Sequence, residues 1–254
     1  MPVQVLCTVA ENRPINDFAW SMTLKTGPEL AGQIACGQFV HIRCGDALLL
    51  RRPISICDWQ GDLVRLVYEV RGEGTEWLSR RRSGDVLDVL GPLGHGFDVS
   101  GQKLLLVGGG IGVPPLLSCA KRAADRGAEV HAAFGFRGLS HQMLTAEFGV
   151  PCGDVFVISD DGTTGRKGFV TELVDEVLDG SFDSVLACGP KPMLKGVAAL
   201  AQARGVPCQV SMEERMGCGV GACLVCACKT ADGHMKHVCK DGPVFLSTEV
   251  DWND

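Results

Sequence analysis

The chain has 254 residues, 46% of them hydrophobic, and a formal net charge of −6. This length suits two domains with a small appendage. The chain lacks a basic block interleaved with aromatic residues, a run of eighteen apolar residues and a charged N-terminus followed by an apolar stretch, so we expect no nucleic-acid partner, no membrane span and no signal peptide. The thirteen cysteines then indicate a reducing, cytoplasmic compartment and roles in metal binding or packing.

Residues 1–99 are predicted to form a small antiparallel β-barrel. Short apolar runs recur at regular spacing between Gly, Pro, Asn and Asp, a pattern typical of strands joined by tight turns. One helix, over about Thr75 to Arg82, interrupts them. The expected strands are Val3–Ala10, Phe18–Lys25, Gln38–Arg43, Pro53–Cys57, Leu63–Val70 and Val86–Leu90.

Residues 100–210 change character, because apolar strands now alternate with helical segments. This alternation predicts a parallel sheet with helices on both faces. The expected strands are Lys103–Val107, Glu129–Phe134, Val155–Ser159, Ser184–Cys188 and Cys208–Met212. The expected helices are Pro114–Arg126, His141–Phe148, Val170–Leu178 and Lys191–Ala203. With the barrel, this makes an α+β multi-domain chain.

Two turns at strand ends of this α/β domain are candidates for binding a dinucleotide. Glycines let the backbone approach a pyrophosphate, and the helix N-terminus that follows supplies free N–H groups. The first turn contains Gly108, Gly109, Gly110 and Gly112, and the second contains Cys188, Gly189 and Pro190. Glycine-rich packing without a ligand is the alternative for the first turn, and a plain connection is the alternative for the second.

Residues 211–254 are too few and too rich in cysteine for an ordinary core, and we expect them to fold around a metal cluster. Their cysteines follow the spacing C-x4-C-x2-C with a distant fourth, which is typical of plant-type [2Fe–2S] sites. Glycines between the first two cysteines would let the loop close over the cluster. The candidate ligands are Cys218, Cys223, Cys226 and Cys239.

Three alternatives to the cluster stay open. A zinc ion could bind Cys223 and Cys226 with His237 and Cys239. The thiols could instead be free core residues, or belong to a disulfide framework. A fifth cysteine of the segment, Cys228, is interpreted as a bystander.

The barrel is expected to hold a flavin. A nicotinamide gives up two electrons as a hydride, whereas an iron–sulfur cluster accepts one at a time, and a flavin is the usual link between them. Arg52-Pro53-Ile54-Ser55 could supply a phosphate ligand and a polar contact to the ring edge. Tyr68 and the helix start at Gly74-Thr75 are further candidates. Each is an ordinary strand or turn segment without the cofactor argument.

Taken together, these motifs resemble the ferredoxin reductase superfamily. They are R-P-I-S at 52–55, G-T at 74–75, G-P-L-G-x-G-F at 91–97, G-G-G-I-G-x-x-P at 108–115 and C-G-P-x-P-M at 188–193. The segments E-x-R-M-x-C-G-x-G-x-C-x-x-C and V-C-x-D-G-P-V-F narrow the resemblance to the electron-transfer subunits of type B dihydroorotate dehydrogenases. The resemblance covers essentially the whole chain.

The resemblance implies FAD in the barrel, NAD in the α/β domain and a [2Fe–2S] cluster in residues 211–254. It also implies an FMN-containing catalytic subunit that oxidises dihydroorotate in pyrimidine synthesis, in a heterotetramer with two copies of each subunit. One departure from the wider superfamily is Ile54, where many members carry an aromatic residue beside the flavin. By position, the FAD contacts would be Arg52, Pro53, Ile54, Ser55, Val67, Tyr68, Glu69, Gly74 and Thr75.

A rival family is the flavin subunit of an NAD(P)H:ferredoxin oxidoreductase or a sulfhydrogenase, and a zinc-stabilised nucleotide-binding module is a rival outside enzymes. Some of the related flavin subunits use a carboxylate as a cluster ligand, whereas this loop offers four cysteines. The choice between NAD and NADP is open. Arg137 could meet a 2′-phosphate, but an isolated surface arginine is the simpler interpretation.

Overall fold

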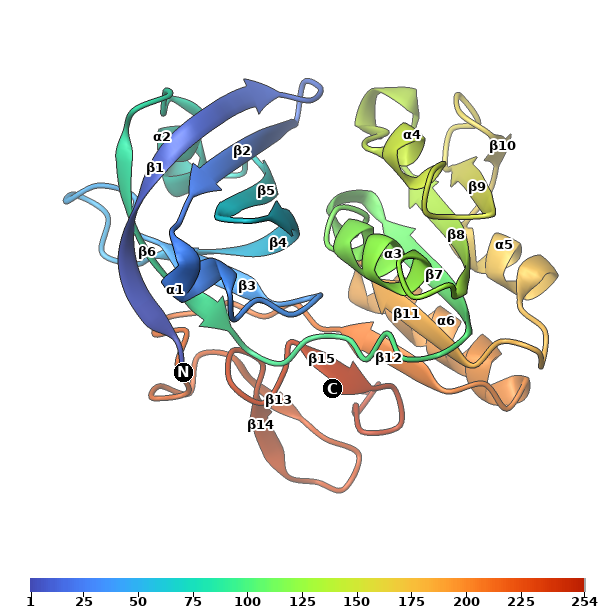
Figure 1. The fold of residues 1–254 in the computed structure, drawn as a ribbon. Coiled ribbons are helices and arrows are strands. Elements are labelled where there is room, and N and C mark those ends of the chain that lie inside the picture. Colours follow the sequence, from blue (N-terminus) through green and yellow to red (C-terminus); the bar gives the residue numbers. More distant parts are fainter. Residues whose placement is uncertain (254) are drawn as a thin grey trace.

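The computed structural model describes residues 1–253. It consists of a β-barrel, an α/β domain beside it and a C-terminal segment that runs beneath both (Figure 1). Both predicted architectures are confirmed, since six antiparallel strands close a barrel and a second, mainly parallel sheet follows in the chain. The domain limits near residues 99 and 210 stay predictions. No helix within residues 1–253 is long and apolar enough to cross a membrane.

The barrel closes in the order β1-β2-β5-β4-β3-β6. Its interior is filled by apolar side chains that alternate along the strands with outward-facing ones, and large members such as Met22, Ile56 and Leu66 are completely buried. The strands are β1 (Val3–Pro14), β2 (Ala19–Lys25), β3 (Phe39–Ile42), β4 (Arg52–Gln60), β5 (Leu63–Glu69) and β6 (Val86–Leu93).

Two short helices accompany the barrel. The helix α1 (Pro28–Ala31) was not predicted, because one turn is too short to show a helical period. The helix α2 (Glu73–Ser79) begins earlier than predicted. Its start is fixed by the Thr75 hydroxyl, which accepts the N–H groups of Arg71 and Gly72 at 2.9 and 3.2 Å and so caps the helix.

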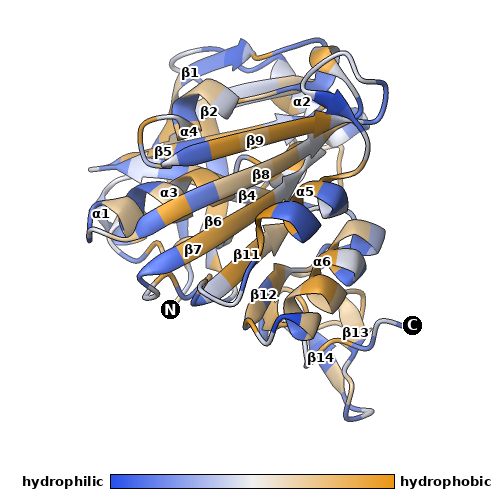
Figure 2. Ribbon diagram, turned by 90° about the vertical axis from the view of Figure 1, so that its right-hand side faces the viewer, coloured by the Kyte–Doolittle hydropathy of each residue, from blue (hydrophilic) through white to orange (hydrophobic). Residues whose placement is uncertain are grey.

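The second sheet has the order β10-β9-β8-β7-β11-β12-β15. The strands β7 and β9 are strongly apolar, as their orange colouring in Figure 2 shows, because helices cover both faces of the sheet. The strand β15 is antiparallel to β12 and comes from the C-terminal segment. The strands are β7 (Lys103–Gly109), β8 (Glu129–Phe136), β9 (Asp154–Ser159), β10 (Arg166–Lys167), β11 (Ser184–Cys188), β12 (Cys208–Ser211) and β15 (Val244–Leu246).

The helices of the α/β domain divide between two cores. The core on one face includes residues of α3 and α4, and the core on the other includes residues of α5 and α6. The helical segments are η1 (Gly110–Gly112), α3 (Leu116–Ala124), η2 (Leu139–His141), α4 (Thr145–Phe148), α5 (Val170–Val177) and α6 (Lys191–Ala203), where η marks a single 3-10 turn.

One predicted helix is wrong. A single helix was expected over 141–148, but the chain makes the separate turns η2 and α4. Gln142 is extended between them, and Leu144 adopts a left-handed conformation with φ of 58°. Both conformations interrupt a helical hydrogen-bond ladder.

The C-terminal segment contains a hairpin, after which the chain returns to the barrel. The hairpin pairs β13 (Ala227–Lys229) with β14 (Met235–His237). The following chain contacts the end of the barrel, where the His95 N–H donates to the Gly242 carbonyl at 2.6 Å. The segment is therefore attached to the barrel at His95 and to the second sheet through β15.

Candidate redox site

A cavity of about 1040 Å³ lies where the barrel, the α/β domain and the C-terminal segment meet. This volume is at the large end of small-molecule sites and suits a dinucleotide-sized cofactor. Of the residues predicted to bind FAD or NAD, all but Arg52, Gly74 and Gly108 line the cavity. The lining members of that set are Pro53, Ile54, Ser55, Val67, Tyr68, Glu69, Thr75, Gly109, Gly110, Gly112, Cys188, Gly189 and Pro190.

The barrel side of the cavity is built by β4 and β5. Tyr68 lines it, but its hydroxyl donates to Asn12 Oδ1 at 3.1 Å, and burial raises the pKa of that phenol. The hydroxyl is thus held by the barrel, which leaves the ring and main chain of Tyr68 to face the cavity. Glu69 is paired with Arg71 at 2.6 Å.

Arg52 lies beside the start of α2. A Cβ atom on Gly74 would sit 2.2 Å from Arg52 Nε, so Gly74 makes room for this guanidinium. Arg52 donates to the carbonyl of Leu50 and has no carboxylate partner among the ion pairs of residues 1–253. Arg51, by contrast, is held by Asp88 at 2.7 Å. Of the two arginines, Arg52 is the one available to a phosphate.

The two glycine-rich turns lie side by side, because β7 and β11 are neighbours and Gly108 pairs with Cys188. The chain passes from β7 toward β9 on one side and then crosses to β11 on the other, so both turns lie at the switch point where open α/β sheets bind ligands. The structure therefore brings the two predicted nucleotide turns together at one edge of the cavity.

Close packing explains some of the glycines in the first of these turns. A Cβ on Gly112 would lie 2.2 Å from the Cys188 carbonyl oxygen, and one on Gly108 would lie 2.7 Å from Val113 Cγ2. Gly110 differs, since it has a φ of +53° and a Cβ placed on it would meet nothing within 4 Å. The packing and ligand interpretations of this turn both apply, and Gly110 is the glycine that faces open space.

The cluster loop has the glycines that its geometry requires. Gly219 and Gly221 have φ values of +75° and +78°, a region that favours glycine. This conformation turns main-chain N–H groups toward sulfur: those of Val220, Ala222 and Cys223 reach Cys218 Sγ at 3.5, 3.3 and 3.4 Å. Burial alone would raise the pKa of the Cys218 thiol. The three N–H groups lower it by a larger amount, so that the pKa falls to about 6. The loop thus stabilises a thiolate, the form that binds metal.

The four predicted cluster cysteines associate as two pairs, Cys218 with Cys223 and Cys226 with Cys239. A [2Fe–2S] cluster requires two thiolates on each of its two irons, whereas a structural zinc ion requires four ligands around a single metal ion. The paired arrangement fits the cluster.

Cys228 lies outside both pairs. It is on β13, opposite Lys236, and burial raises its pKa. Its interpretation as a bystander stays a prediction.

Several residues at the site were not singled out from the sequence. Phe18 and His141 stack with their ring centroids 4.1 Å apart, and both line the cavity. Met216 and Phe39 also line it. Hydrophobic periodicity could place Phe39 on a strand, but contacts between distant segments decide that these residues meet.

His41 is the most unusual of the residues that sequence analysis missed. Its side chain is completely buried on β3, and neither ring nitrogen makes a well-formed hydrogen bond. Burial and then the charge of Arg51 lower its pKa to about 4, while a hydrogen-bonding interaction with the Cys218 main chain opposes this shift. The ring is therefore neutral near pH 7.

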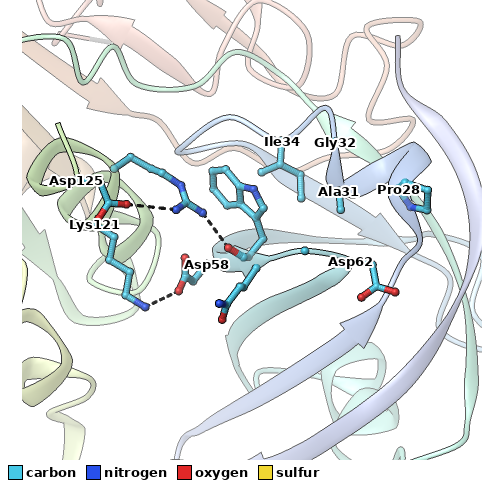
Figure 3. A pocket seen from close by; sticks show the side chains of 12 residues that line it. Pro28, Ala31, Gly32, Ile34, Asp58, Asp62, Lys121 and Asp125 are labelled. Atoms are coloured by element: carbon cyan, nitrogen blue, oxygen red, sulfur yellow. Dashed lines mark hydrogen bonds and ion pairs between the residues drawn. The ribbon is translucent and has the colours of Figure 1, made fainter.

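A second cavity, of about 890 Å³, lies at another place on the junction between the barrel and α3. Its charged groups bind one another: Lys121 Nζ is 2.5 Å from Asp58 Oδ2, and Arg122 donates to the Trp59 carbonyl at 2.8 Å (Figure 3). These contacts join the two domains. We therefore assign this cavity to the junction between the two domains.

The fold and the site define a class of protein: a flavin and iron–sulfur electron carrier built on the ferredoxin reductase architecture. A family model described as the iron-sulfur cluster binding domain of dihydroorotate dehydrogenase B matches residues 213–251, which contain all four predicted ligands. A solved structure from work on flavin-based electron bifurcation by NADH-dependent reduced ferredoxin-NADP oxidoreductase superposes with a TM-score of 0.88 at 32% identity, over 97% of this chain and 90% of that one.

Curated relatives identify the family more narrowly. The chain is 46% identical to the dihydroorotate dehydrogenase B (NAD(+)) electron transfer subunit of Bacillus pumilus, over 96% of both chains. It is 44% identical to the same subunit of Geobacillus thermodenitrificans, again over 96% of both chains. The chain belongs to the family of dihydroorotate dehydrogenase B electron transfer subunits. A ferredoxin reductase from a carbazole 1,9a-dioxygenase system, 20% identical with a TM-score of 0.70, shares the fold.

Proposed function

We propose that this chain carries electrons between a dihydroorotate-oxidising subunit and NAD, through a [2Fe–2S] cluster and FAD. One observation supports this most directly: a single cavity is lined by the predicted flavin strands, the predicted nucleotide turns and Met216 beside the cluster loop. A bound flavin would exchange a hydride with the nicotinamide and single electrons with the cluster. The three parts of the chain thus converge on one place where these exchanges can occur.

The chain's own residues have separable roles in this proposal. On the barrel, Arg52 and the N-terminal turn of α2 hold phosphate, while the main chain and side chains of β4 and β5 hold the ring. On the α/β domain, the turns at Gly108–Gly112 and Cys188–Pro190 hold NAD. Cys218, Cys223, Cys226 and Cys239 would bind the two irons of the cluster. The stack of Phe18 on His141 joins the two domains at the cavity.

The partner we propose is an FMN-containing dihydroorotate dehydrogenase catalytic subunit, in a heterotetramer with two copies of each chain. The names of the relatives support a catalytic partner. The cluster loop also exposes apolar side chains, with Val220, Leu224 and Val225 at 43, 79 and 55% exposure. Exposed apolar groups of this kind mark protein contacts. The proposed location is the cytoplasm, because the cysteines of residues 1–253 form no disulfide.

The rival function, a flavin subunit of an NAD(P)H:ferredoxin oxidoreductase or sulfhydrogenase, agrees with the same fold. The higher identity to dihydroorotate dehydrogenase B subunits, 46% against 32%, favours the first function. We propose NAD rather than NADP as the nucleotide. Arg137 lines the cavity, but Asp160 lines it as well, and a carboxylate disfavours a 2′-phosphate by charge repulsion.

Co-expression with the FMN subunit tests this function. The expected product is a complex with FAD, FMN, iron and acid-labile sulfide that reduces NAD with dihydroorotate. A chain that purifies alone, with FAD and iron but without affinity for that subunit, would support the rival function.

A further inference from the structure

His41 occupies a place between the flavin strands and the cluster loop. Along β3, Val40 and Ile42 belong to the barrel core, so Phe39 and His41 point to the opposite face. Phe39 lines the cavity and pairs with Ser55, and His41 pairs with Pro53, another cavity residue. His41 therefore pairs directly with a predicted flavin contact, on the same face of β3 as Phe39.

The other side of the His41 ring is covered by the cluster loop. A Cβ atom on Gly219 would lie 2.5 Å from His41 Nδ1 and 3.1 Å from Cε1, so the ring rests directly on the Gly219 main chain. Gly219 follows the predicted ligand Cys218, whose main chain also faces the ring. A glycine at 219 is thus required twice, by its positive φ and by the imidazole packed on it.

A histidine with a purely structural role in the core normally has its ring nitrogens hydrogen-bonded, because a buried polar group without a partner costs free energy. Neither nitrogen of His41 makes a well-formed hydrogen bond although the ring is completely buried, and the main-chain group that acts on the ring is that of Cys218. An apolar side chain would fill this place at lower cost. The polar ring is explained if its N–H acts on a neighbouring group, and the cluster ligand loop is the neighbour.

We propose that His41 is a positioning residue that holds the Cys218–Gly219 main chain against the flavin-binding strands and places a polar N–H beside the cluster, raising the cluster's reduction potential. This inference rests on the proposed function, since it requires a cluster in the loop. Nearby hydrogen-bond donors and polarity stabilise the reduced, more negative cluster and so raise its potential.

The test uses the full chain and compares His41→Phe with His41→Gln. His41→Phe keeps the ring-shaped volume and removes the N–H, and we expect the cluster potential to fall so that electrons shift about tenfold toward FAD, which is about 59 mV for one electron. His41→Gln retains an N–H and should recover most of the shift. Ile42→Val, on the same strand but in the barrel core, is the matched control and should leave the potential unchanged.

The readouts are a redox titration of the cluster, its electron paramagnetic resonance spectrum in the reduced state, and iron and sulfide per FAD. A His41→Phe chain with full cluster content and the wild-type potential and spectrum would overturn the inference. A wild-type chain without iron would instead contradict the proposed function, so the two failures can be told apart.

A second pair of variants keeps the inference testable if His41→Phe does not retain its cluster. Gly219→Ala should lower iron per FAD, because the new methyl meets the imidazole. His41→Ala combined with Gly219→Ala removes that contact, while the strain of the positive φ is the same in both. We expect the double variant to lose less iron than the losses of the two single variants added together. Additive losses would show that the ring does not act on the Gly219 main chain.

Discussion

Arg52 and Arg51 are adjacent in the sequence but have different surroundings in the structure. Replacing each with alanine should therefore separate an effect on FAD binding from an effect on stability. Arg52 lies beside Gly74 at the start of α2 without a carboxylate partner among the described ion pairs. A hydrogen bond to a charged group contributes about 1.5–3 kcal/mol, so Arg52→Ala should weaken FAD binding roughly ten- to a hundredfold. It should barely change the unfolding temperature of the chain without flavin.

Arg51→Ala is the matched control. Arg51 binds Asp88 at 2.7 Å, with the two side chains only 21 and 17% exposed, and also donates to the carbonyls of His41 and Asp88. Removing it leaves a mostly buried carboxylate with only the Gln4 amide as a side-chain partner, which costs about 1–3 kcal/mol. We expect a lower unfolding temperature in Arg51→Ala with little loss of intrinsic FAD affinity.

The assay is FAD content after dialysis, followed by titration of FAD into the flavin-free chain, with thermal unfolding measured in parallel. Wild-type FAD affinity in Arg52→Ala would refute the assignment of the phosphate to Arg52. It would place the phosphate on Arg51 or on main-chain N–H groups.

Two further predictions concern the other sites. Cys239→Ser should lose most iron and sulfide while keeping FAD, because the Cys239 thiol pairs with Cys226. Unchanged iron per FAD would exclude Cys239 as a ligand and make Cys228 the next candidate. Gly112→Ala should weaken NADH binding at least tenfold and lower the unfolding temperature, because the new methyl would lie 2.2 Å from the Cys188 carbonyl oxygen and push the two turns apart. The KM for NADH is measured by steady-state kinetics with ferricyanide as acceptor. An unchanged KM would show that the two turns do not bind the nucleotide together.

Most of the correct predictions of strands and helices came from patterns that are local in the chain. Each of the six predicted barrel strands overlaps a strand of the structure, since period-two alternation and turn residues are local properties. The helix over Lys191–Ala203 has the predicted bounds, helped by the proline in its first turn. The cysteine spacing was informative for the same reason, because a cluster loop is a local device.

Features that depend on contacts between distant segments were not predictable. The pairing of β15 with β12 joins the end of the chain to the nucleotide sheet, and nothing in the three residues of β15 specifies that partner. His41 is a single histidine in an apolar strand, and its contact with Gly219 spans most of the chain. The Phe18–His141 stack arises in the same way, from the docking of one domain on another.

The most direct test of the account follows electrons through the chain with and without its cluster. The isolated chain should pass electrons from NADH to ferricyanide but should not oxidise dihydroorotate, and adding the FMN subunit should couple dihydroorotate oxidation to NAD reduction. Cys218→Ser should keep the first activity, because hydride transfer requires only the nicotinamide and FAD sites, and lose the coupled reaction. Coupled turnover by a Cys218→Ser complex shown to lack iron, or dihydroorotate oxidation by the isolated chain, would contradict the account.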